Sequence, residues 1–563
     1  MSAEPRQTLH ERFVANLTRE TTDPWTKFET GIPMRDGIEL AADVYLPKGQ
    51  SGPFPTIVEL TPYDKSGAFM IDDVGLFTRN GYAIVVVDLR GRGKSEGEWS
   101  PPLFDAPDSH DAVEWAAVQP WSTGKVGMTG LSYMGWVQWA AASEHPPHLA
   151  AMISTSAAGR WQQEIPYTDG CLQLYFGWWA YMVRRRITEF HGLETNDWEE
   201  ILRWLPIEKI GEFINPAGPL WENMVGRDRL DDFWRAVRYD DQYDTFDIPV
   251  LHVTGWYDLE DLLGAFHHYE HMMAASPAKA SQRLIVGPWS HVNSRMPHHS
   301  YAGDFLSDDA ALDMDAEHVR WMDYWLKDEQ NGALDTAPVR IYEPGSNRWR
   351  EEQSWPLSTK EETFYLSFDG AAGSLASEEP PDDSPAQSYR YDPLDPVPTQ
   401  IDIRKYPVEH VPLDQTGNEA RSDVISYTSE VLTEPITISG WAHLKLNAAS
   451  DCDDTDFHVK ITDVRPDGRS MKVTQGCKRA SYRNSLSEPT AIVPNEPFEI
   501  DIELWPTHHA FLPGHQIRVT VTSSDFPWFA RNLNQFGHIR YQSEPKIATN
   551  TILPGSRIVL PVE

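Results

Sequence analysis

Short apolar runs rich in β-branched residues recur along the first part of the chain, with segments long enough for a helix between them. The runs occupy residues 55–60, 82–87, 126–129, 248–254 and 283–286. Continuous apolar runs of this length are typical of strands buried on both faces, and helix-length connections between strands indicate a mostly parallel sheet. The pattern therefore predicts an α/β fold with helices on both faces of the sheet.

A long segment at 156–245 interrupts this alternation. It is rich in Trp, Tyr, Arg and Glu at helical spacing, as in residues 198–204 and 230–237. Insertions of this kind commonly shape a pocket where the strands of the sheet end. We therefore expect a helical cap at 156–245, flanked by two parts of the α/β domain at 1–155 and 246–350.

The pattern changes in the last third of the chain, where polar and apolar residues alternate. Runs with a period of two cover residues 436–446, 498–504 and 516–521, and connectors rich in Pro and acidic residues, such as 378–385, separate such runs. This alternation predicts half-buried strands of antiparallel sheets. We expect residues 351–563 to form an all-β sandwich, with a jelly roll as the predicted topology.

Composition limits the partners of such a protein. The 563 residues carry a net charge of −36, which repels nucleic-acid phosphates and anionic membrane surfaces, so neither is expected as a partner. Aromatic residues make up 11% of the chain, enough for an aromatic-lined pocket. No apolar stretch approaches the ~18 residues of a membrane span, and the N-terminus lacks the apolar core of a signal peptide. Together with three cysteines that form no C-x-x-C pair, these features predict a cytoplasmic protein.

One segment has the pattern of a reactive serine. At 125–135 an apolar strand leads into Gly-Leu-Ser-Tyr-Met-Gly, which predicts a sharp turn at Ser132 between a strand and a helix. At such a turn the hydroxyl projects clear of the backbone, and the Tyr133 amide points toward a developing oxyanion. The usual pattern has glycine at the position of Met134, whereas here the glycine follows at Gly135. The alternative is an ordinary strand-to-helix turn with a serine at the helix cap.

Two further polar residues follow predicted strands, where a serine nucleophile needs its acid and its base. The strand at 248–254 leads into Gly-Trp-Tyr-Asp, which ends at Asp258, and the strand at 283–286 leads into Gly-Pro-Trp-Ser-His, which ends at His291. The order Ser, Asp, His is the one in which triads occur in this kind of sheet. Asp258 would orient the imidazole, and His291 would take the proton of Ser132. Asp258 as a helix N-cap and His291 as one of 20 histidines are the alternatives.

A second oxyanion donor is expected beside the Tyr133 amide. Leu-Thr-Pro-Tyr-Asp-Lys at 60–65 follows a strand that would neighbour the nucleophile strand, which makes the Tyr63 hydroxyl the candidate. A tyrosine that supports a loop is the alternative, and the sequence does not separate the two.

Together these motifs resemble a known group of enzymes, the serine hydrolase superfamily of cocaine esterase, α-amino acid ester hydrolases, glutaryl acylases and X-prolyl dipeptidyl peptidases. The similar segments lie at 61–65, 88–97, 130–135, 255–258, 287–291 and 454–468. The similarity covers nearly the whole chain from about residue 25. It implies an α/β-hydrolase domain, a helical cap and a C-terminal jelly roll. It also implies a triad of Ser132, Asp258 and His291 and an oxyanion hole made by Tyr63 and the Tyr133 amide.

Carboxylates next to the predicted acid bear on the substrate. Glu260 and Asp261 follow Asp258 at a spacing that resembles the α-amino acid ester hydrolases, in which such carboxylates and one from the cap hold the substrate's α-ammonium group. Asp169, in Pro-Tyr-Thr-Asp-Gly, is the match for the third carboxylate. Clustered carboxylates favour a cation, but acidic residues in the first turn of a helix are also favoured by the helix dipole without any ligand. Both explanations of Glu260 and Asp261 stay open.

Three segments resemble metal or phosphate motifs only in part. Gly-Arg-Gly-Lys-Ser at 91–95 lacks the first glycine of a phosphate-binding loop, and residues 451–456 lack the glycine and glutamate of a calcium loop. His-His-Tyr-Glu-His at 267–271 has the H-x-x-E-H spacing of a zinc protease, but a third ligand is needed. No metal or organic cofactor is therefore expected.

The sequence thus predicts a serine hydrolase that cleaves small-molecule esters or amides through an acyl-enzyme, with α-amino acyl esters and β-lactam side chains as the favoured substrates. A carboxylesterase for neutral acyl groups and then an X-prolyl dipeptidyl peptidase are the next alternatives. A binding protein that keeps the fold without catalysis is disfavoured by the complete triad. Related enzymes are often oligomeric, so the resemblance leaves a homo-oligomer open, although no segment identifies an interface.

Overall fold

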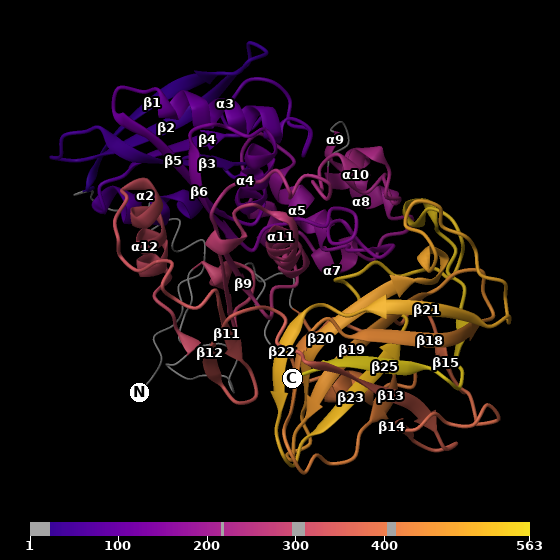
Figure 1. Cartoon of the computed structure of the whole chain (residues 1–563). Coiled ribbons are helices and arrows are strands. Elements are labelled where there is room, and N and C mark those ends of the chain that lie inside the picture. The colour runs from indigo at the N-terminus through magenta and orange to yellow at the C-terminus, as the bar shows by residue number, and fades with distance from the viewer. Residues whose placement is uncertain (1–22, 215–218, 296–309, 402–412) are drawn as a thin grey trace.

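The computed structural model describes residues 23–214, 219–295, 310–401 and 413–563 (Figure 1). Within these residues, the first part of the chain forms a ten-stranded sheet. In spatial order its strands are β1 (Trp25–Pro33), β2 (Glu39–Pro47), β4 (Ala83–Asp88), β3 (Phe54–Thr61), β5 (Ser122–Leu131), β6 (Leu149–Thr155), β9 (Val250–Gly255), β10 (Gln282–Gly287), β11 (Val339–Glu343) and β12 (Arg348–Glu352).

Most of this sheet is parallel. All neighbouring pairs from β4 to β11 run parallel, whereas β1 with β2, β2 with β4, and β11 with β12 are antiparallel. The five apolar runs singled out in the sequence lie on β3, β4, β5, β9 and β10, where nearly every residue is buried. The predicted α/β fold with a parallel sheet is therefore confirmed.

Helices cover both faces of this sheet (Figure 1). They are α2 (Ala68–Arg79), α3 (Asp105–Ala117), α4 (Tyr133–Ser143), α11 (Leu262–Ala275) and α12 (Met314–Leu326). Helices α2 and α12 contact each other, and so do α3 and α4. Helix α11 lies beside α4, where the rings of His268 and Trp139 stack with their centroids 4.1 Å apart.

The cap lies between β6 and β9 in the sequence. Its described elements are β7 (Tyr167–Thr168), β8 (Cys171–Leu172), α5 (Phe176–Val183), α6 (His191–Thr195), α7 (Trp198–Ile201), α8 (Glu208–Ile214), α9 (Pro219–Met224) and α10 (Asp232–Arg235). The two segments predicted to be helical contain α7 and α10, each four residues long. Asp197 and Asp231 cap these helices by accepting hydrogen bonds from backbone amides.

The last part of the chain is built mainly of strands. Within the described residues, thirteen strands form one connected sheet that encloses a second hydrophobic core. They are β13 (Lys360–Phe368), β14 (Gly373–Ala376), β15 (Gln387–Tyr391), β16 (Ile425–Thr428), β17 (Ile436–Gly440), β18 (His443–Ser450), β19 (Asp456–Val464), β20 (Ser470–Arg479), β21 (Phe498–Glu503), β22 (Thr507–Phe511), β23 (Gln516–Thr522), β24 (Ala548–Ile552) and β25 (Arg557–Val562). The expected C-terminal all-β domain is confirmed.

One alternating run is divided in the structure. Residues 436–446 contain the whole of β17 and the start of β18, with a break after Gly440, whose φ is +133°. Strand β17 pairs with β22 and β25. Strand β18 shares the partner β25 and pairs in addition with β21 and β24. The alternation of polar and apolar residues continues across this break, so the sequence pattern alone does not locate it.

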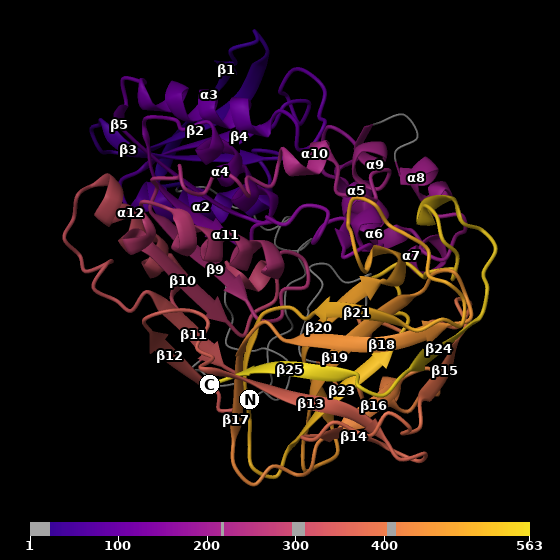
Figure 2. The same ribbon diagram turned by 45° about the vertical axis from the view of Figure 1, so that its right-hand side comes forward.

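The cap and the all-β domain are joined by direct contacts (Figure 2). The Ala530 amide donates to the Leu172 carbonyl, and the Leu174 amide donates to the Trp528 carbonyl, each at 2.8 Å. The rings of Tyr175 and Trp528 stack with their centroids 4.3 Å apart. The C-terminal domain therefore supports the part of the cap that follows β8.

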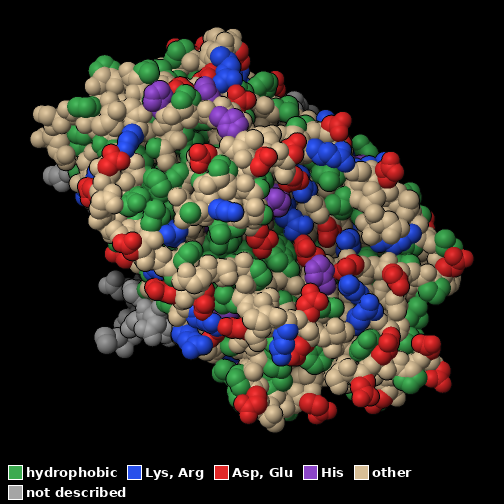
Figure 3. Space-filling view, in the orientation of Figure 1, with side chains coloured by type: hydrophobic (Ala, Val, Ile, Leu, Met, Phe, Trp, Pro, Cys, Tyr) green, Lys and Arg blue, Asp and Glu red, His purple; other side chains and the backbone are tan. Residues whose placement is uncertain are grey.

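Acidic side chains are dispersed on the face of the molecule drawn in Figure 3. They are spread among basic and apolar side chains. The net charge of −36 is therefore not gathered at one place on this face. Among the described helices, none is both long enough and apolar enough to cross a membrane.

A buried ion pair stabilises the all-β domain. The Nε of Arg479 donates to Oδ2 of Asp454 at 2.7 Å, and both side chains are buried. The amide and hydroxyl of Ser481 also donate to Asp454, at 3.0 and 2.9 Å. Removal of the guanidinium would leave a buried carboxylate without its cation.

We expect Arg479→Met to lower the free energy of unfolding by about 3–5 kcal/mol, because breaking a buried pair leaves an uncompensated charge. The control is Arg469→Met, which removes an exposed pair with Asp467 and is expected to cost less than about 1 kcal/mol. Urea unfolding followed by tryptophan fluorescence measures both. Equal losses in the two variants would contradict this account of the buried pair.

Candidate active site

Ser132 lies at the apex of the turn between β5 and α4. Its backbone has φ 64° and ψ −128°, a conformation that a residue other than glycine adopts only under strain. Such strain is characteristic of strand-to-helix turns that project a nucleophile. The Ser132 amide donates to the Thr155 carbonyl on β6, and the Trp136 amide donates to the Ser132 carbonyl, each at 3.0 Å. These two bonds fix the turn on both sides.

Two glycines explain why this turn departs from the usual pattern. A Cβ at Gly130 would lie 2.6 Å from the Cβ of Met134. A Cβ at Gly135 would lie 2.9 Å from both the Cβ of Ala157 and the carbonyl oxygen of Thr155. The close approach of α4 to the chain around β6 therefore requires glycine at position 135. Position 134 can therefore hold a methionine, because the close contact with Ala157 and Thr155 is made by the next residue, Gly135.

Asp258 and His291 are paired at the ends of the neighbouring strands β9 and β10. The Nδ1 of His291 lies 3.1 Å from each carboxylate oxygen of Asp258, and both side chains are buried. The amides of Glu260 and Asp261 donate to Oδ1 of Asp258 at 2.9 and 3.1 Å. Burial opposes ionisation of Asp258, but His291 outweighs it and lowers the pKa of this carboxyl. The pair therefore presents the other ring nitrogen, Nε2, for further contacts.

A carboxylate stands between the serine and the histidine. The Ser132 hydroxyl donates to Oδ2 of Asp261 at 3.4 Å, and Nε2 of His291 lies 3.9 Å from the same oxygen. The Oε2 of Glu260 lies 3.7 Å from that nitrogen. The sequence predicts a hydrogen bond from Ser132 to His291. In the structure the Ser132 hydroxyl donates instead to Asp261. Catalytic hydrogen bonds are often long or misaligned before substrate binds, so this arrangement is compatible with a triad.

The acidic groups change the protonation of the histidine. Burial alone would lower the pKa of His291, but Glu260, Asp258 and Asp261 outweigh it and raise this pKa to about 10. Burial raises the pKa of Glu260 to about 7. It also raises the pKa of Asp261 well above its usual range, with Glu164 adding to the effect. The acidic groups therefore favour the protonated imidazole, which must lose its proton before it can act as a base.

The two predicted oxyanion donors lie next to Ser132. The Tyr63 hydroxyl accepts a hydrogen bond from Nε1 of Trp179 at 3.0 Å and contacts Ser132. Burial raises the pKa of Tyr63, so its hydroxyl stays protonated. The Tyr133 hydroxyl donates to Asp105 at 2.5 Å and is committed there. The Tyr133 amide lies in the first turn of α4, where backbone N–H groups have no partner within the helix.

Ser132 opens onto a small pocket. Its aromatic lining consists of Tyr63, Tyr133, Trp161, Tyr175, Phe176 and Trp179. The polar part of the wall contains Glu260, which accepts from the Tyr175 hydroxyl at 3.3 Å, and Asp261. The Oδ1 of Asp261 is buried and has no hydrogen-bond partner among the described residues. Because a buried carboxylate oxygen without a partner is costly, this wall is suited to a ligand with a cation or a hydrogen-bond donor.

The third predicted carboxylate does not lie in this pocket. Asp169 accepts from Nε2 of Gln163 at 3.3 Å and lies 3.8 Å from Nζ of Lys478 on β20. Its carbonyl accepts from the Arg479 amide at 3.1 Å, so the turn between β7 and β8 rests on the all-β domain. The turn therefore directs Asp169 toward that domain, and Asp169 is not among the residues that line the pocket with Glu260 and Asp261.

Glu164, which no sequence motif marks, is a fourth acidic group beside this site, next to Asp258, Glu260 and Asp261. Its carboxylate accepts from the amides of Gly159, Arg160 and Gly264 at 3.0, 3.2 and 2.5 Å. Burial outweighs these bonds and raises the pKa of Glu164 to about 7. No motif marks this residue, and only the folding of the cap over α11 brings it near Asp261.

The segment with zinc-protease spacing does not form that kind of site. His267 and His271 lie near Asp240, which is a third residue able to bind a metal. The Nε2 of His267 already lies 3.0 Å from Asp240, whose other oxygen accepts from Arg238 at 2.8 Å. Glu270, the glutamate of the motif, accepts from two tryptophan indoles. The carboxylates are thus engaged without a metal.

Comparison with known proteins identifies the family of this chain. Residues 36–293 match the X-Pro dipeptidyl-peptidase (S15) family, and residues 331–557 match the X-Pro dipeptidyl-peptidase C-terminal non-catalytic domain. The cocaine esterase of Rhodococcus sp. (strain MB1 Bresler) is 33% identical, covering 94% of this chain and 97% of its own length. The chain belongs to the S15 family of serine hydrolases.

Solved structures share the whole architecture of this S15 hydrolase. An α-amino acid ester hydrolase matches with a TM-score of 0.85 at 27% identity, covering 97% of this chain and 98% of the other. An aminopeptidase from a marine sediment archaeon, Thaumarchaeota archaeon, matches with a TM-score of 0.83 at 25% identity, covering 100% and 99%. The α/β-hydrolase fold with a C-terminal all-β domain is thereby confirmed.

The carboxylates around His291 lead to a prediction for the S15 hydrolase. Its activity on a neutral ester should rise with pH as His291 loses its proton, because only the neutral imidazole is a base. Glu260→Gln removes a negative charge, lowers the pKa of His291 and should move this rising limb to lower pH. The measurement is kcat/KM against pH.

The control for this profile is Glu189→Gln in the cap, where the carboxylate pairs with Arg184 and does not line the pocket. Its profile should match that of the unmodified enzyme. If kcat/KM of Glu260→Gln rises over the same pH range as that of the unmodified enzyme, Glu260 does not raise the pKa of His291.

Proposed function

We propose that this hydrolase cleaves esters and amides of α-amino acids, including the amino-acyl side chains of β-lactams, through an acyl-enzyme on Ser132. The observation that carries the proposal is the buried, unpaired Oδ1 of Asp261, which lies with Glu260 in the wall of the Ser132 pocket in the part of the chain that the structure describes. A protonated α-amino group supplies the charge and the N–H donors that this wall lacks. The names of two similar structures, an α-amino acid ester hydrolase and an aminopeptidase, support a substrate of this class.

In the proposed reaction the Ser132 oxygen forms a bond to the acyl carbon while its proton passes to Nε2 of His291. The same proton then goes to the leaving alcohol or amine as its bond to the acyl carbon breaks. Water repeats the sequence and releases the acid. Asp258 holds the imidazole through Nδ1, and the Tyr63 hydroxyl and the Tyr133 amide donate to the oxyanion.

The two carboxylates also make the pKa of His291 depend on the charge of the substrate. A substrate ammonium group between Glu260 and Asp261 provides the positive charge that the imidazolium of His291 provides in its absence. Once the ammonium is bound, His291 loses its proton at a lower pH and accepts the proton of Ser132. A neutral acyl group leaves the carboxylates paired with the imidazolium. The charged substrate is then favoured over the neutral one in two ways. It binds more tightly, and its ammonium group causes His291 to lose the proton that prevents it from acting as a base.

A carboxylesterase for neutral acyl groups is the second candidate. It is supported by the 33% identity with a cocaine esterase and by the aromatic lining of the pocket. An X-prolyl dipeptidyl peptidase is supported by the family match alone. A binding protein without catalysis would keep the fold but leave Ser132 unreactive.

At a pH high enough for His291 to lose its proton, a fluorophosphonate probe should form an adduct on Ser132 in the folded protein, because the neutral imidazole then accepts the proton of Ser132. Tyr63→Phe should react about 10²–10³-fold more slowly, since it removes one donor to the charged oxygen. The measurement is the rate of adduct formation, with the modified residue identified by mass spectrometry. Ser143→Ala at the end of α4 is the control, because that hydroxyl donates to the Ala140 carbonyl within the helix. Folded protein without an adduct on Ser132 would exclude the catalytic proposal.

The ammonium site is tested with phenylglycine methyl ester and its des-amino analogue, phenylacetic acid methyl ester. We expect kcat/KM to favour the amine by about tenfold or more, the equivalent of about 1.4 kcal/mol, because a charge-assisted contact is made by only one substrate. Glu260→Gln and Asp261→Asn should each reduce this preference.

Asp169→Asn is the matched control, since it removes a carboxylate of the cap that lies outside the pocket. Its preference for the amine should be unchanged. An unmodified enzyme that hydrolyses both esters equally would refute ammonium recognition and favour the neutral carboxylesterase.

A further inference from the structure

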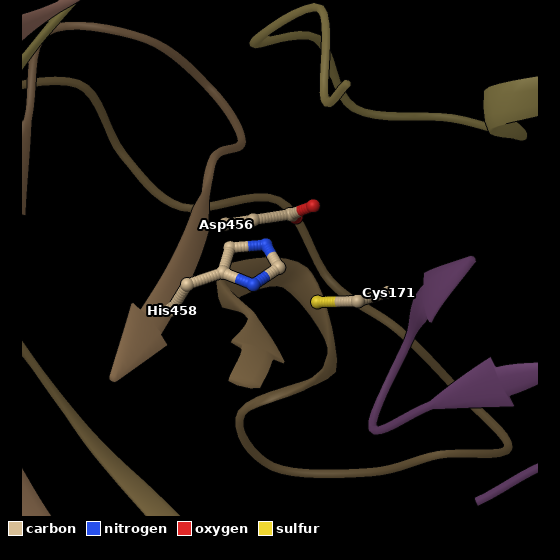
Figure 4. Close-up of side chains that lie close together, drawn as sticks. All are labelled: Cys171, Asp456 and His458. Atoms are coloured by element: carbon tan, nitrogen blue, oxygen red, sulfur yellow. The ribbon is translucent and has the colours of Figure 1, made fainter. Parts of the chain in front are cut away.

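Four metal-binding side chains meet where the cap hairpin rests on the all-β domain. Cys171 belongs to β8, Asp456 and His458 to β19, and Cys477 to β20. Asp456 and His458 are two residues apart on one strand and therefore face the same side of the sheet. Cys477 is the register partner of His458 on the neighbouring strand. Figure 4 shows the Cys171 sulfur directed toward the His458 ring, with the Asp456 carboxylate beside it.

The candidate ligand atoms are close enough to share one ion. One ligand atom each from Cys171, Asp456 and His458 lie within 4.8 Å of one another. Around a tetrahedral zinc ion with bonds of about 2.0–2.3 Å, neighbouring ligand atoms are roughly 3.3–3.8 Å apart. A small inward movement of the three side chains therefore brings them to zinc distances. The thiol of Cys477 interacts with that of Cys171 and donates to the Thr168 carbonyl at 3.7 Å, and it is our candidate for a fourth ligand.

The cluster is closed to solvent, and one of its ligand atoms has no hydrogen-bond partner among the described residues. Cys171, Asp456, Cys477 and His458 are 0%, 1%, 2% and 3% exposed. The Nε2 of His458 is buried without a hydrogen-bond partner in the part of the chain that the structure describes. The Asp456 carboxylate is buried as well, and the Cys171 thiol is its neighbour. Buried polar atoms of this kind are costly, and a bound cation would satisfy both types of ligand at once.

The ligand types favour zinc over the commoner divalent ions. Thiolate, imidazole and carboxylate are the groups that bind zinc, whereas calcium and magnesium require oxygen ligands. The other oxygen of Asp456 accepts from Nδ2 of Asn532 at 2.6 Å, a contact of the kind that orients a ligating carboxylate. A buried set that can supply four protein ligands leaves no open position, so the site would be structural.

We propose that Cys171, Asp456, His458 and Cys477 bind a structural zinc ion that fastens the cap hairpin to the all-β domain. The ion binds as the two parts fold together, and the thiols release their protons to the solvent when they bind it. The hairpin continues directly into Gln173, Tyr175 and Phe176, which line the Ser132 pocket. The ion therefore stabilises one wall of the pocket without taking part in the reaction.

The test begins with the metal content of the full chain, expressed in zinc-supplemented medium without a polyhistidine tag. Mass spectrometry of the metals should find roughly one zinc ion per chain, and Cys171→Ser and His458→Gln should each lose most of it. Protein loaded with Co²⁺ instead should show the intense visible absorption of a tetrahedral thiolate site. Prolonged chelation should lower the thermal midpoint, and Zn²⁺ but not Mg²⁺ should restore it.

Two variants serve as matched controls. Cys452→Ser removes the remaining cysteine of the chain, and His271→Gln disrupts the cluster near Asp240, so both should keep their zinc. Folded protein that contains no zinc, or zinc that remains in both Cys171→Ser and His458→Gln, would overturn the proposal. A disulfide between Cys171 and Cys477 in the purified protein would also overturn it. If the two variants fail to fold, the metal content and the Co²⁺ spectrum of the unmodified protein decide the question.

Discussion

Negative charge buried around a single imidazole is the constraint on which the active site depends. Asp258, Glu260 and Asp261 all lie near His291, and buried carboxylates are tolerated only when a cation or hydrogen bonds compensate them. Asp258 has two backbone amides as donors, so its charge is stabilised by the turn itself. Glu260 and Asp261 face the pocket, where burial raises the pKa of both, and a neighbouring cation would favour their ionised forms. In the proposed reaction the imidazolium of His291 is that cation until a substrate ammonium group replaces it.

The positions of the candidate triad could be predicted because a parallel sheet brings the carboxyl ends of its strands to one edge. Ser132, Asp258 and His291 each follow a strand that is visible as an apolar run, so their order along the chain implied their proximity. The contact between Ser132 and Asp261 could not be predicted, since it depends on side-chain conformations within one turn. Glu164 was also missed, because three backbone amides from distant segments create its environment and no motif precedes it.

The fold was predictable where burial leaves a simple pattern. Strands β3 and β4 are buried on both faces and appear as continuous apolar runs, whereas the edge strand β1 is mostly exposed or half-buried and carries polar residues. Strand β6 was not singled out, because it begins Leu-Ala-Ala-Met and lacks a run of β-branched residues. In the cap, aromatic residues at helical spacing predicted helices, but several of these helices are only four or five residues long. The length of these helices depends on how the cap packs against its neighbours, and the spacing of residues within one segment carries no information about that packing.

The stacking of Trp528 on Tyr175 has a consequence for how the specificity of this enzyme can change. Tyr175 donates to Glu260, and Glu260 lies beside His291, so three successive contacts connect a strand-rich C-terminal domain to the reacting imidazole. If Glu260 selects the acyl group as proposed, a substitution in the loop around Trp528 would alter that choice without touching the substrate. Sequence changes in the C-terminal domain, which is regarded as non-catalytic, would then change which substrates the enzyme cleaves. The two halves of the chain would therefore have to evolve together.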